Sequence, residues 1–132
     1  RTADPRIFAV GDAACRKING IYHPTYHWTA AADQATQVAQ LICGISVAEP
    51  LVDDHYFWSE QHGSRLQFMG QSAPQSRVVM ASGSIEEDKF VALCCHDDIV
   101  IGVLSLGNPR DFLKFSMPLR RGEPFTLPPE FR

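Results

Sequence analysis

The sequence predicts an α+β protein in which the end of an α/β domain precedes a small domain of antiparallel strands and helices. Three observations support this expectation. An apolar run at residues 7–10 is followed by Gly11 and Asp12, and then by one long amphipathic segment. Beyond residue 55 the pattern changes to short apolar runs separated by turn residues, which is typical of an antiparallel sheet. A second helical segment follows the last of these runs.

Residues 7–12, Ile-Phe-Ala-Val-Gly-Asp, are the first predicted element, a short buried strand that stops abruptly. A continuous apolar run is typical of a strand that is covered on both faces. Gly11 allows a sharp turn or the close approach of another group. Asp12 would project from the carboxyl end of the strand, where open α/β sheets bind ligands, and its carboxylate is suited to accept hydrogen bonds from sugar-like hydroxyls. The same pattern also fits a strand followed by an ordinary Asp turn.

Residues 13–26 are expected to be irregular, and the clearest helix is predicted at residues 28–43, ended by Gly44. Small and apolar side chains recur along one face of this helix at helical spacing. The residues of this face are Ala31, Ala35, Val38 and Ile42. We therefore expect the small-residue face to pack closely against a sheet.

The second part of the chain begins with an aromatic cluster, Tyr56–Ser59, and continues with predicted strands. The predicted strands are residues 66–70, 77–81, 89–95 and 99–106. The last two are apolar at nearly every position and are separated by only three residues, so they are expected to form a central hairpin. Asn108 and Pro109 are favourable first residues for a final helix, which Pro118 should end or kink.

Composition excludes several classes of function. The 132 residues include 12 Lys and Arg against 15 Asp and Glu, a formal net charge of −3, which indicates neither nucleic acid nor an anionic membrane surface as a partner. The apolar runs are too short for a membrane span, and residues 1–5 lack the apolar region of a signal peptide. Because a strand is expected almost at the first residue, we expect the chain to continue upstream in a longer protein.

The four cysteines and five histidines do not form a recognisable metal or redox motif. There is no C-x-x-C pair, so dithiol chemistry is not predicted, and no His has zinc-ligand spacing from a Cys, so no metal site is predicted. Cys94 and Cys95 are adjacent and would point to opposite faces of a strand. The thiols are expected to be reduced and mostly buried, as in a cytoplasmic protein.

Four groups of residues, in this order along the chain, resemble one family of flavoproteins. They are Thr2-x-x-x-x-Ile7-Phe8-Ala9-Val10-Gly11-Asp12; His27-Trp28-Thr29-x-Ala31 with Gln34-Ala35; Phe57-Trp58-Ser59-x-Gln61 with Leu66-Gln67-x-x-Gly70; and Asn108-x-Arg110-Asp111-Phe112. The first resembles the second FAD-binding motif of reductases with two dinucleotide-binding domains, and the second continues it. The others resemble the start and the closing helix of the C-terminal domain of NADH-dependent ferredoxin reductases, which supply aromatic-ring dioxygenases and some P450 systems.

The resemblance implies a domain assignment. Residues 1–44 would be the tail of the FAD-binding domain, residues 45–54 a linker, and residues 55–121 the C-terminal reductase domain. Residues 122–132, which are rich in proline, would be an extended tail. Gly11 and Asp12 would lie at the cofactor, with Asp12 binding a ribityl hydroxyl of FAD.

The resemblance also implies that the helix start at His27, Trp28 and Thr29 approaches the pyrimidine end of the isoalloxazine. Backbone N–H groups and the positive end of a helix dipole stabilise the negative charge that develops there on reduction. Trp28 and Trp58 would border the ring, and core packing at a domain seam is the alternative for each. The family often has an acidic residue shortly before this Trp. Here Tyr26 and His27 take that place, and His27 would either tune the flavin's charge state or be a surface residue.

No G-x-G-x-x-G fingerprint occurs in the sequence, so both dinucleotide-binding motifs would lie upstream. We therefore expect the chain to be a C-terminal fragment that is inactive alone and binds FAD weakly or not at all. The parent would pass electrons from NADH through FAD to a ferredoxin or rubredoxin. An acidic acceptor would be steered by basic residues. The candidates are Arg65, Arg77, Arg110, Arg120 and Arg121, although a solvated face also explains most of them.

The alternative function is a non-catalytic interaction domain that forms a homodimer. Its self-complementary patch would come from the apolar strands together with Phe112, Phe115 and Met117.

Overall fold

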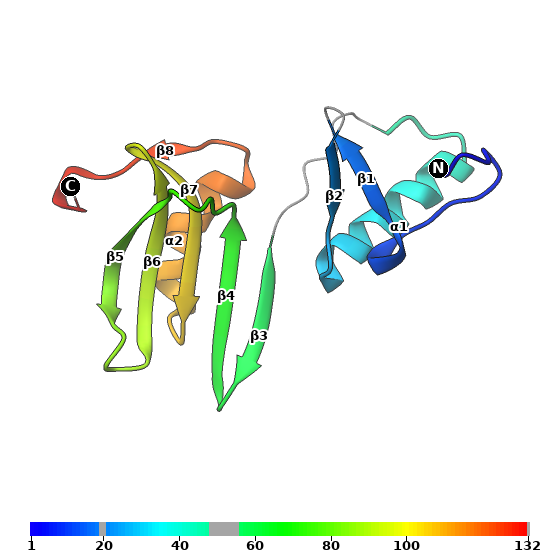
Figure 1. Ribbon diagram of the computed structural model, residues 1–132. Helices are drawn as coiled ribbons and strands as arrows, with labels where there is room; N and C mark the ends of the chain where they lie inside the picture. Colours follow the sequence, from blue (N-terminus) through cyan, green and yellow to red (C-terminus); the bar gives the residue numbers. More distant parts are fainter. Residues whose placement is uncertain (19–20, 48–55, 132) are drawn as a thin grey trace. The chain divides into compact units, whose positions relative to one another are not determined.

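The computed structural model describes residues 1–18, 21–47 and 56–131, and the chain divides into two compact units, Arg1–Asp53 and Asp54–Arg132 (Figure 1). Among its described residues, the first unit contains a short 3-10 turn, a two-stranded hairpin and one helix. The second contains a six-stranded antiparallel sheet and one α-helix. The predicted α+β class is confirmed. The predicted linker at residues 45–54 lies outside the described residues from residue 48 onward.

Residues 7–12 do not form the predicted strand. The backbone of Val10 is extended, with φ −140° and ψ 162°, but Gly11–Ala13 then form the 3-10 turn η1. Ile7 is 55% exposed rather than buried. The expectation of a buried strand here is wrong because a strand is defined by hydrogen bonds to a neighbour, and no described segment pairs with residues 7–10.

The segment expected to be irregular contains an antiparallel hairpin. Strand β1, Cys15–Ile18, pairs with β2, Ile21–Pro24, with Ile18 opposite Ile21. Asn19 and Gly20 separate the two strands in the sequence, and Asn-Gly is the strongest short-range signal of a hairpin turn. That signal was present in the sequence and was missed.

The helix predicted at residues 28–43 is confirmed as α1, Trp28–Ile42. Its predicted end at Gly44 is also confirmed. Gly44 has φ +72°, a conformation that suits glycine. Its N–H donates to the carbonyl of Leu41, and the N–H of Ile45 donates to that of Gln40, which is the Schellman arrangement that ends a helix.

The inward face of α1 differs from the predicted one. Its buried residues are Ala30 and Gln34, whereas Ala35 and Ile42 of the expected face are exposed. The difference has a local cause, because the side chain of Gln34 turns inward to accept a backbone hydrogen bond from Gly11. The inward face of α1 is thus formed around Gln34, a polar residue with a specific hydrogen-bond partner, and not around the predicted row of apolar residues.

The sheet of the second unit has the strand order β3-β4-β7-β6-β5, with β8 paired to β7. Its strands are β3 Phe57–Gln61, β4 Ser64–Gly70, β5 Arg77–Ser84, β6 Lys89–His96, β7 Ile99–Leu106 and β8 Phe125–Thr126. The four predicted strands and the central β6–β7 hairpin are confirmed. Residues 57–59 of the aromatic cluster belong to the edge strand β3, which pairs with β4.

Helix α2, Pro109–Arg120, covers one face of this sheet and lies behind β6 and β7 in Figure 1. It starts at Asn108 and Pro109, as predicted. The main buried cluster lies between the helix and the sheet. Its residues are Met69, Val91, Leu93, Cys95, Val100, Val103, Phe112, Phe115 and Leu127. No described helix of the chain is long and apolar enough to cross a membrane.

Pro118 does not end α2, which continues to Arg120, and a kink at Pro118 stays a prediction. It lies within the last turn, where a missing N–H removes little from a helix that is about to end. Gly122, with φ +72°, donates to the carbonyl of Leu119, and the N–H of Glu123 donates to the carbonyl of Pro118. Pro118 therefore contributes to the end of the helix only through its carbonyl group, which accepts backbone hydrogen bonds.

The expected extended tail at residues 122–132 is part of the second unit wherever it is described. It supplies strand β8 and the 3-10 turn η2, Pro129–Phe131. Leu127 is completely buried, and its N–H donates to the carbonyl of Asp98 at 2.7 Å. The resemblance assigns the C-terminal domain only to residue 121 and does not predict this closing segment.

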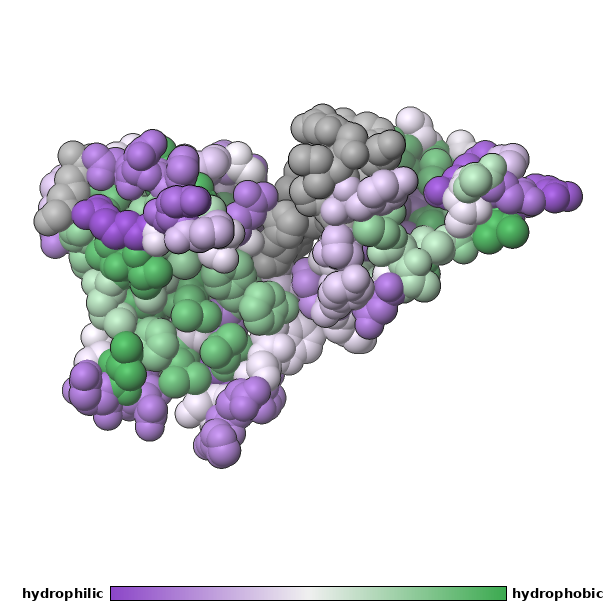
Figure 2. All heavy atoms as spheres, viewed as in Figure 1, coloured by the Kyte–Doolittle hydropathy of each residue, from purple (hydrophilic) through white to green (hydrophobic). Residues whose placement is uncertain are grey.

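The sheet face opposite α2 is apolar and is covered by no described helix of this unit. One row of cross-strand neighbours runs across it: Phe57, Phe68, Leu104, Ala92 and Met80. Figure 2 shows hydrophobic side chains gathered over this face of the unit. Phe57 and Met80 at the two ends of the row remain exposed.

Candidate functional site

A buried hydrogen bond joins the turn η1 to helix α1. The N–H of Gly11 donates to Oε1 of Gln34 at 2.8 Å, and both residues are buried. Gly11 has φ +65°, and a Cβ at this position would lie 3.3 Å from the Cβ of Ala31. Only glycine therefore combines this backbone conformation with such close packing. The chain after Val10 is fixed against the first two turns of α1.

This hydrogen bond between Gly11 and Gln34, which we call the clamp, places Asp12 beside the N-terminal half of α1. Asp12 lies within η1, and its side chain is exposed. The sequence predicted that it would project from the end of a strand, and its position in a 3-10 turn corrects that expectation. An exposed carboxylate next to the start of a helix is still well placed to accept hydrogen bonds from hydroxyl groups. Gln34, which the sequence analysis quoted only within a motif, is the residue that holds this turn.

His27 is the N-cap of α1, a function that the sequence analysis did not assign to it. Its Nδ1 accepts a hydrogen bond from the N–H of Ala30 at 3.2 Å and lies 2.8 Å from Oγ1 of Thr29. Its carbonyl accepts from the N–H of Ala31. His27 thereby fixes the orientation of the first turn, including Thr29.

Trp28 is the first residue of α1 and is 73% exposed. Its side chain is therefore not part of the core of the first unit. The first unit thus collects five predicted site residues around the start of one helix. These are Gly11, Asp12, His27, Trp28 and Thr29.

The sixth predicted site residue, Trp58, belongs to the second unit. It lies on the edge strand β3 and is 37% exposed. Its ring stacks on that of Tyr56, with centroids 5.8 Å apart and an interplanar angle of 25°. Tyr56 is held in turn by Gln67, whose Nε2 donates to the phenolic oxygen at 3.0 Å, and by the ring of Phe112 at 6.0 Å. Trp58 is therefore an exposed aromatic residue whose ring is oriented by its stacking on Tyr56.

Gln67 is itself buried and only partly satisfied. Its Oε1 has no hydrogen-bond partner among the described residues. A buried polar atom without a partner carries a free-energy cost. The amide nitrogen of Gln67 nevertheless donates to the phenolic oxygen and so holds the ring of Tyr56 in place.

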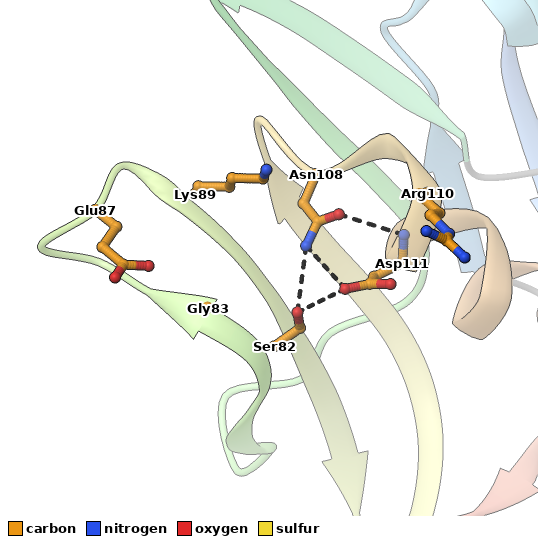
Figure 3. Close-up of a pocket in the computed structure, with 7 residues that line it drawn as sticks. All are labelled: Ser82, Gly83, Glu87, Lys89, Asn108, Arg110 and Asp111. Carbon is orange, nitrogen blue, oxygen red and sulfur yellow. Dashed lines mark hydrogen bonds between the residues drawn. The ribbon is translucent and has the colours of Figure 1, made fainter.

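A polar cluster at the start of α2 was not predicted. Figure 3 shows Ser82, Asn108 and Asp111 joined by hydrogen bonds in a shallow pocket that Glu87, Lys89 and Arg110 also line. Oγ of Ser82 donates to Oδ2 of Asp111 at 2.6 Å, and Nδ2 of Asn108 donates to the same oxygen at 3.0 Å. The cluster fixes the helix start to strand β5. Its components were visible in the sequence, but only the fold brings Ser82 to them.

These hydrogen bonds lower the pKa of the Asp111 carboxyl, with the bond from Ser82 as the largest cause and that from Asn108 next. A carboxyl whose pKa is lower in the folded than in the unfolded state stabilises the fold above its unfolded pKa of about 3.9. This contribution is lost as the pH falls through the lower, folded-state pKa. The cluster therefore stabilises the start of α2 at neutral pH.

The cysteines are all free, and two of them are buried, Cys94 and Cys95. Burial raises the pKa of both thiols. Cys15 and Cys43 are exposed, so the expectation of mostly buried thiols holds for only half of them. Within residues 1–18, 21–47 and 56–131, no group of three or more His, Cys, Asp or Glu is arranged to hold a metal ion.

Comparison with known proteins finds similar proteins for both units. Residues 56–128, more than half of the chain, match the family model described as Reductase C-terminal. The ferredoxin reductase for the CYP199A2 system from Rhodopseudomonas palustris has a TM-score of 0.80 and 30% sequence identity, over 93% of this chain and 30% of that one. Putidaredoxin reductase, solved in a covalent complex with putidaredoxin, has a TM-score of 0.74 and 26% identity, over 89% of this chain and 28% of that one.

A third similar structure, Fdr9, has a TM-score of 0.71 and 25% identity, over 92% of this chain and 32% of that one. The chain thus spans about a third or less of each of these proteins. The likeness extends over nearly the whole chain, including the first unit, and it confirms the family that the sequence motifs indicated. The chain belongs to the Reductase C-terminal family and corresponds to the C-terminal part of a ferredoxin reductase.

Proposed function

We propose that this chain is the C-terminal part of a cytoplasmic flavoprotein that oxidises NADH and passes electrons through FAD to a ferredoxin or rubredoxin. The observation that carries the proposal is the clamp between Gly11 and Gln34, which sets the exposed carboxylate of Asp12 beside the capped start of α1. Likeness to ferredoxin reductases over 93% of the chain supports the same function.

The residues around the start of α1 fit a flavin nucleotide. An exposed carboxylate accepts hydrogen bonds from ribityl hydroxyls, and Asp12 is such a group. The positive end of a 15-residue helix, at Trp28 and Thr29, favours an electron-rich ring edge. The exposed indole of Trp28 offers an apolar surface to a ring system. When bound, FAD would supply two-electron acceptance from NADH and single-electron delivery to the acceptor.

The chain's own contribution in this proposal is to bind and orient. Gln34 holds the backbone of Gly11, and so holds the carboxylate that follows it. His27 fixes the first turn of α1 through the N–H of Ala30. In the second unit, Tyr56 holds Trp58, which we propose borders the ring. Such positioning reduces the reorganisation needed when electrons are transferred.

A chimera tests this function. The C-terminal 30% of the Rhodopseudomonas palustris reductase, which this chain matches in structure, is replaced by this chain. We expect the purified chimera to reduce a ferredoxin at the expense of NADH, and this chain alone to show no such activity. Oxidation of NADH is followed together with reduction of the ferredoxin. A folded chimera with FAD bound and no NADH-dependent transfer would contradict the proposed function.

A second candidate function, homodimerisation, rests on the apolar sheet face opposite α2. The self-complementary patch suggested by the sequence is wrong in part, because Phe112 and Phe115 of α2 are buried in the core between the helix and the sheet. Exposed apolar side chains on the opposite face of the sheet include Val78 and Met80 of edge strand β5. Light scattering on the chimera and on the isolated chain separates a dimer of the reductase from association of the isolated chain alone.

A further inference from the structure

Gln67 is a buried amide on the helix-facing side of the sheet. It lies on β4 between Trp58 of β3 and Ser105 of β7, its cross-strand neighbours. Met69, two positions further along β4, points to the same side of the sheet and belongs to the buried cluster between α2 and the sheet. Gln67 is 8% exposed, so packing alone would favour an apolar residue at this position too.

The two ends of the Gln67 amide have different surroundings. Nε2 donates to the phenolic oxygen of Tyr56 at 3.0 Å. Oε1 is buried and has no hydrogen-bond partner among the described residues. The hydroxyl of the neighbouring Ser105 donates instead to the carbonyl of Asn108 at 3.1 Å. A buried acceptor without a donor destabilises a fold, and one neutral hydrogen bond at the other end of the amide does not fully offset that cost.

The hydrogen bond of this amide holds a pair of aromatic rings. Tyr56 is fixed at its hydroxyl by Gln67, and its ring lies 6.0 Å from that of Phe112. The indole of Trp58 stacks on the other aromatic ring of the pair, Tyr56, with centroids 5.8 Å apart and planes inclined by 25°. Because 37% of Trp58 is exposed, the core alone does not set its orientation, and the ring on which it stacks becomes important.

We infer that Gln67 is a positioning residue, which fixes the orientation of Trp58 through Tyr56 while its unpaired oxygen lowers the stability of the second unit. This inference rests on the proposed function, in which Trp58 borders the flavin ring, and it names the residue that sets the angle of that border. Residues that hold a functional site in a defined geometry are often not the best residues for stability.

A purely structural role for Gln67 predicts the opposite effect on stability. If the amide stabilised the sheet edge, its replacement by an apolar residue would lower the stability of the second unit. If the amide serves position, the same replacement removes the unpaired oxygen and leaves stability equal or higher. Replacing Tyr56 distinguishes the two roles further, because Tyr56→Phe leaves the buried amide without the partner of Nε2.

Stability is measured first, by urea unfolding of the 132-residue chain. Gln67→Met exchanges the amide for an apolar side chain of similar size. We expect its unfolding midpoint to be equal to or higher than that of the unchanged chain. Tyr56→Phe should lower the midpoint, and Gln67→Met/Tyr56→Phe should recover most of that loss, since both partners are then apolar. The control Gln61→Met makes the same exchange at an exposed position of β3 and should leave the midpoint unchanged.

The orientation of Trp58 is measured in the same chain. The sequence has two tryptophans, so Trp28→Phe leaves Trp58 as the single reporter. In that background, Gln67→Met should weaken the tryptophan band of the near-ultraviolet circular dichroism and lower the fluorescence anisotropy. Tyr56→Phe should have the same effect, and the double variant should add little, because the two side chains form one hydrogen bond. Gln61→Met should change neither signal.

The consequence for function is measured in the chimera with the Rhodopseudomonas palustris reductase, using the ferredoxin of that reductase. We expect Gln67→Met to lower kcat for NADH-dependent reduction of the ferredoxin roughly three- to tenfold, because a misplaced group at a reaction site slows the reaction. The KM values for NADH and the ferredoxin should stay within about twofold, since neither binds to the buried amide. Gln61→Met should leave kcat unchanged.

The outcomes separate the positioning role from the function. Either a lower unfolding midpoint in Gln67→Met or an unchanged Trp58 signal overturns the inference and leaves the proposed function standing. An unchanged kcat in Gln67→Met, with the Trp58 signal altered, also overturns the inference alone. If the chimera without further substitution is folded, holds FAD and does not reduce the ferredoxin, the proposed function is contradicted and the inference with it.

Discussion

Replacing Phe112 with alanine is expected to destabilise the second unit by about 3–5 kcal/mol, which is the usual cost of removing a large buried aromatic side chain. Phe112 is 2% exposed and belongs to the cluster between α2 and the sheet. Its ring also contacts that of Tyr56. The free energy of unfolding is measured by denaturant titration, with circular dichroism as the readout.

The neighbouring residue is the control for this experiment. Leu113 follows Phe112 on the same helix but is exposed, so Leu113→Ala should change the free energy of unfolding by less than about 1 kcal/mol. Because Tyr56 stacks on Trp58, Phe112→Ala should also alter the fluorescence of Trp58 before the unit unfolds. Similar stability losses in the two variants would contradict the arrangement of α2 on the sheet.

Replacing Asp12 with alanine in the chimera is expected to weaken FAD binding roughly 10- to 100-fold, because hydrogen bonds to a charged group contribute about 1.5–3 kcal/mol. The fold should be unaffected, since the side chain of Asp12 is exposed and the clamp uses only the backbone of Gly11. The dissociation constant of FAD is measured by titration of the apo-chimera.

Asp33→Ala provides the matched control. Asp33 is an exposed carboxylate of α1 and was not assigned to the site. Its removal changes the net charge by the same amount as the removal of Asp12. We expect no change in FAD affinity for this variant. Equal affinity in both variants, with both folded, would remove Asp12 from the site.

The second unit was largely predictable because its signals are local. Apolar runs separated by turn residues indicated β4 to β7, and the pair Asn108-Pro109 marked the start of α2. The hairpin of β6 and β7 followed from the short connection between two apolar runs. In each case a single stretch of sequence contained the pattern and its limits.

The first unit was less predictable because its structure depends on pairing between segments. Residues 7–10 have the composition of a buried strand, but a strand forms only where a neighbour supplies hydrogen bonds. The inward face of α1 was misjudged because Gln34 is drawn in by the N–H of Gly11. The spacing of apolar residues along a sequence does not predict a specific polar contact of this kind.

The sequence predicted which residues form the candidate site, but not the hydrogen bonds that hold them in position. Gly11, Asp12 and the start of α1 do lie together, whereas their fastening by Gln34 and the capping by His27 emerged only from the structure. The cluster of Ser82, Asn108 and Asp111 required two distant segments to meet. Side-chain contacts across the fold are not contained in a linear pattern, and they determine most of this site's geometry.

The FAD content of the purified chimera tests most directly whether this chain completes a flavin site. Protein-bound flavin is quantified per polypeptide by its absorbance after removal of free cofactor, with the isolated chain carried through the same procedure. We predict about one FAD per chimera, since a complete site binds one cofactor, and little or none on the isolated chain. A folded chimera that contains no FAD, although the parent reductase retains it, would contradict the proposed flavin site.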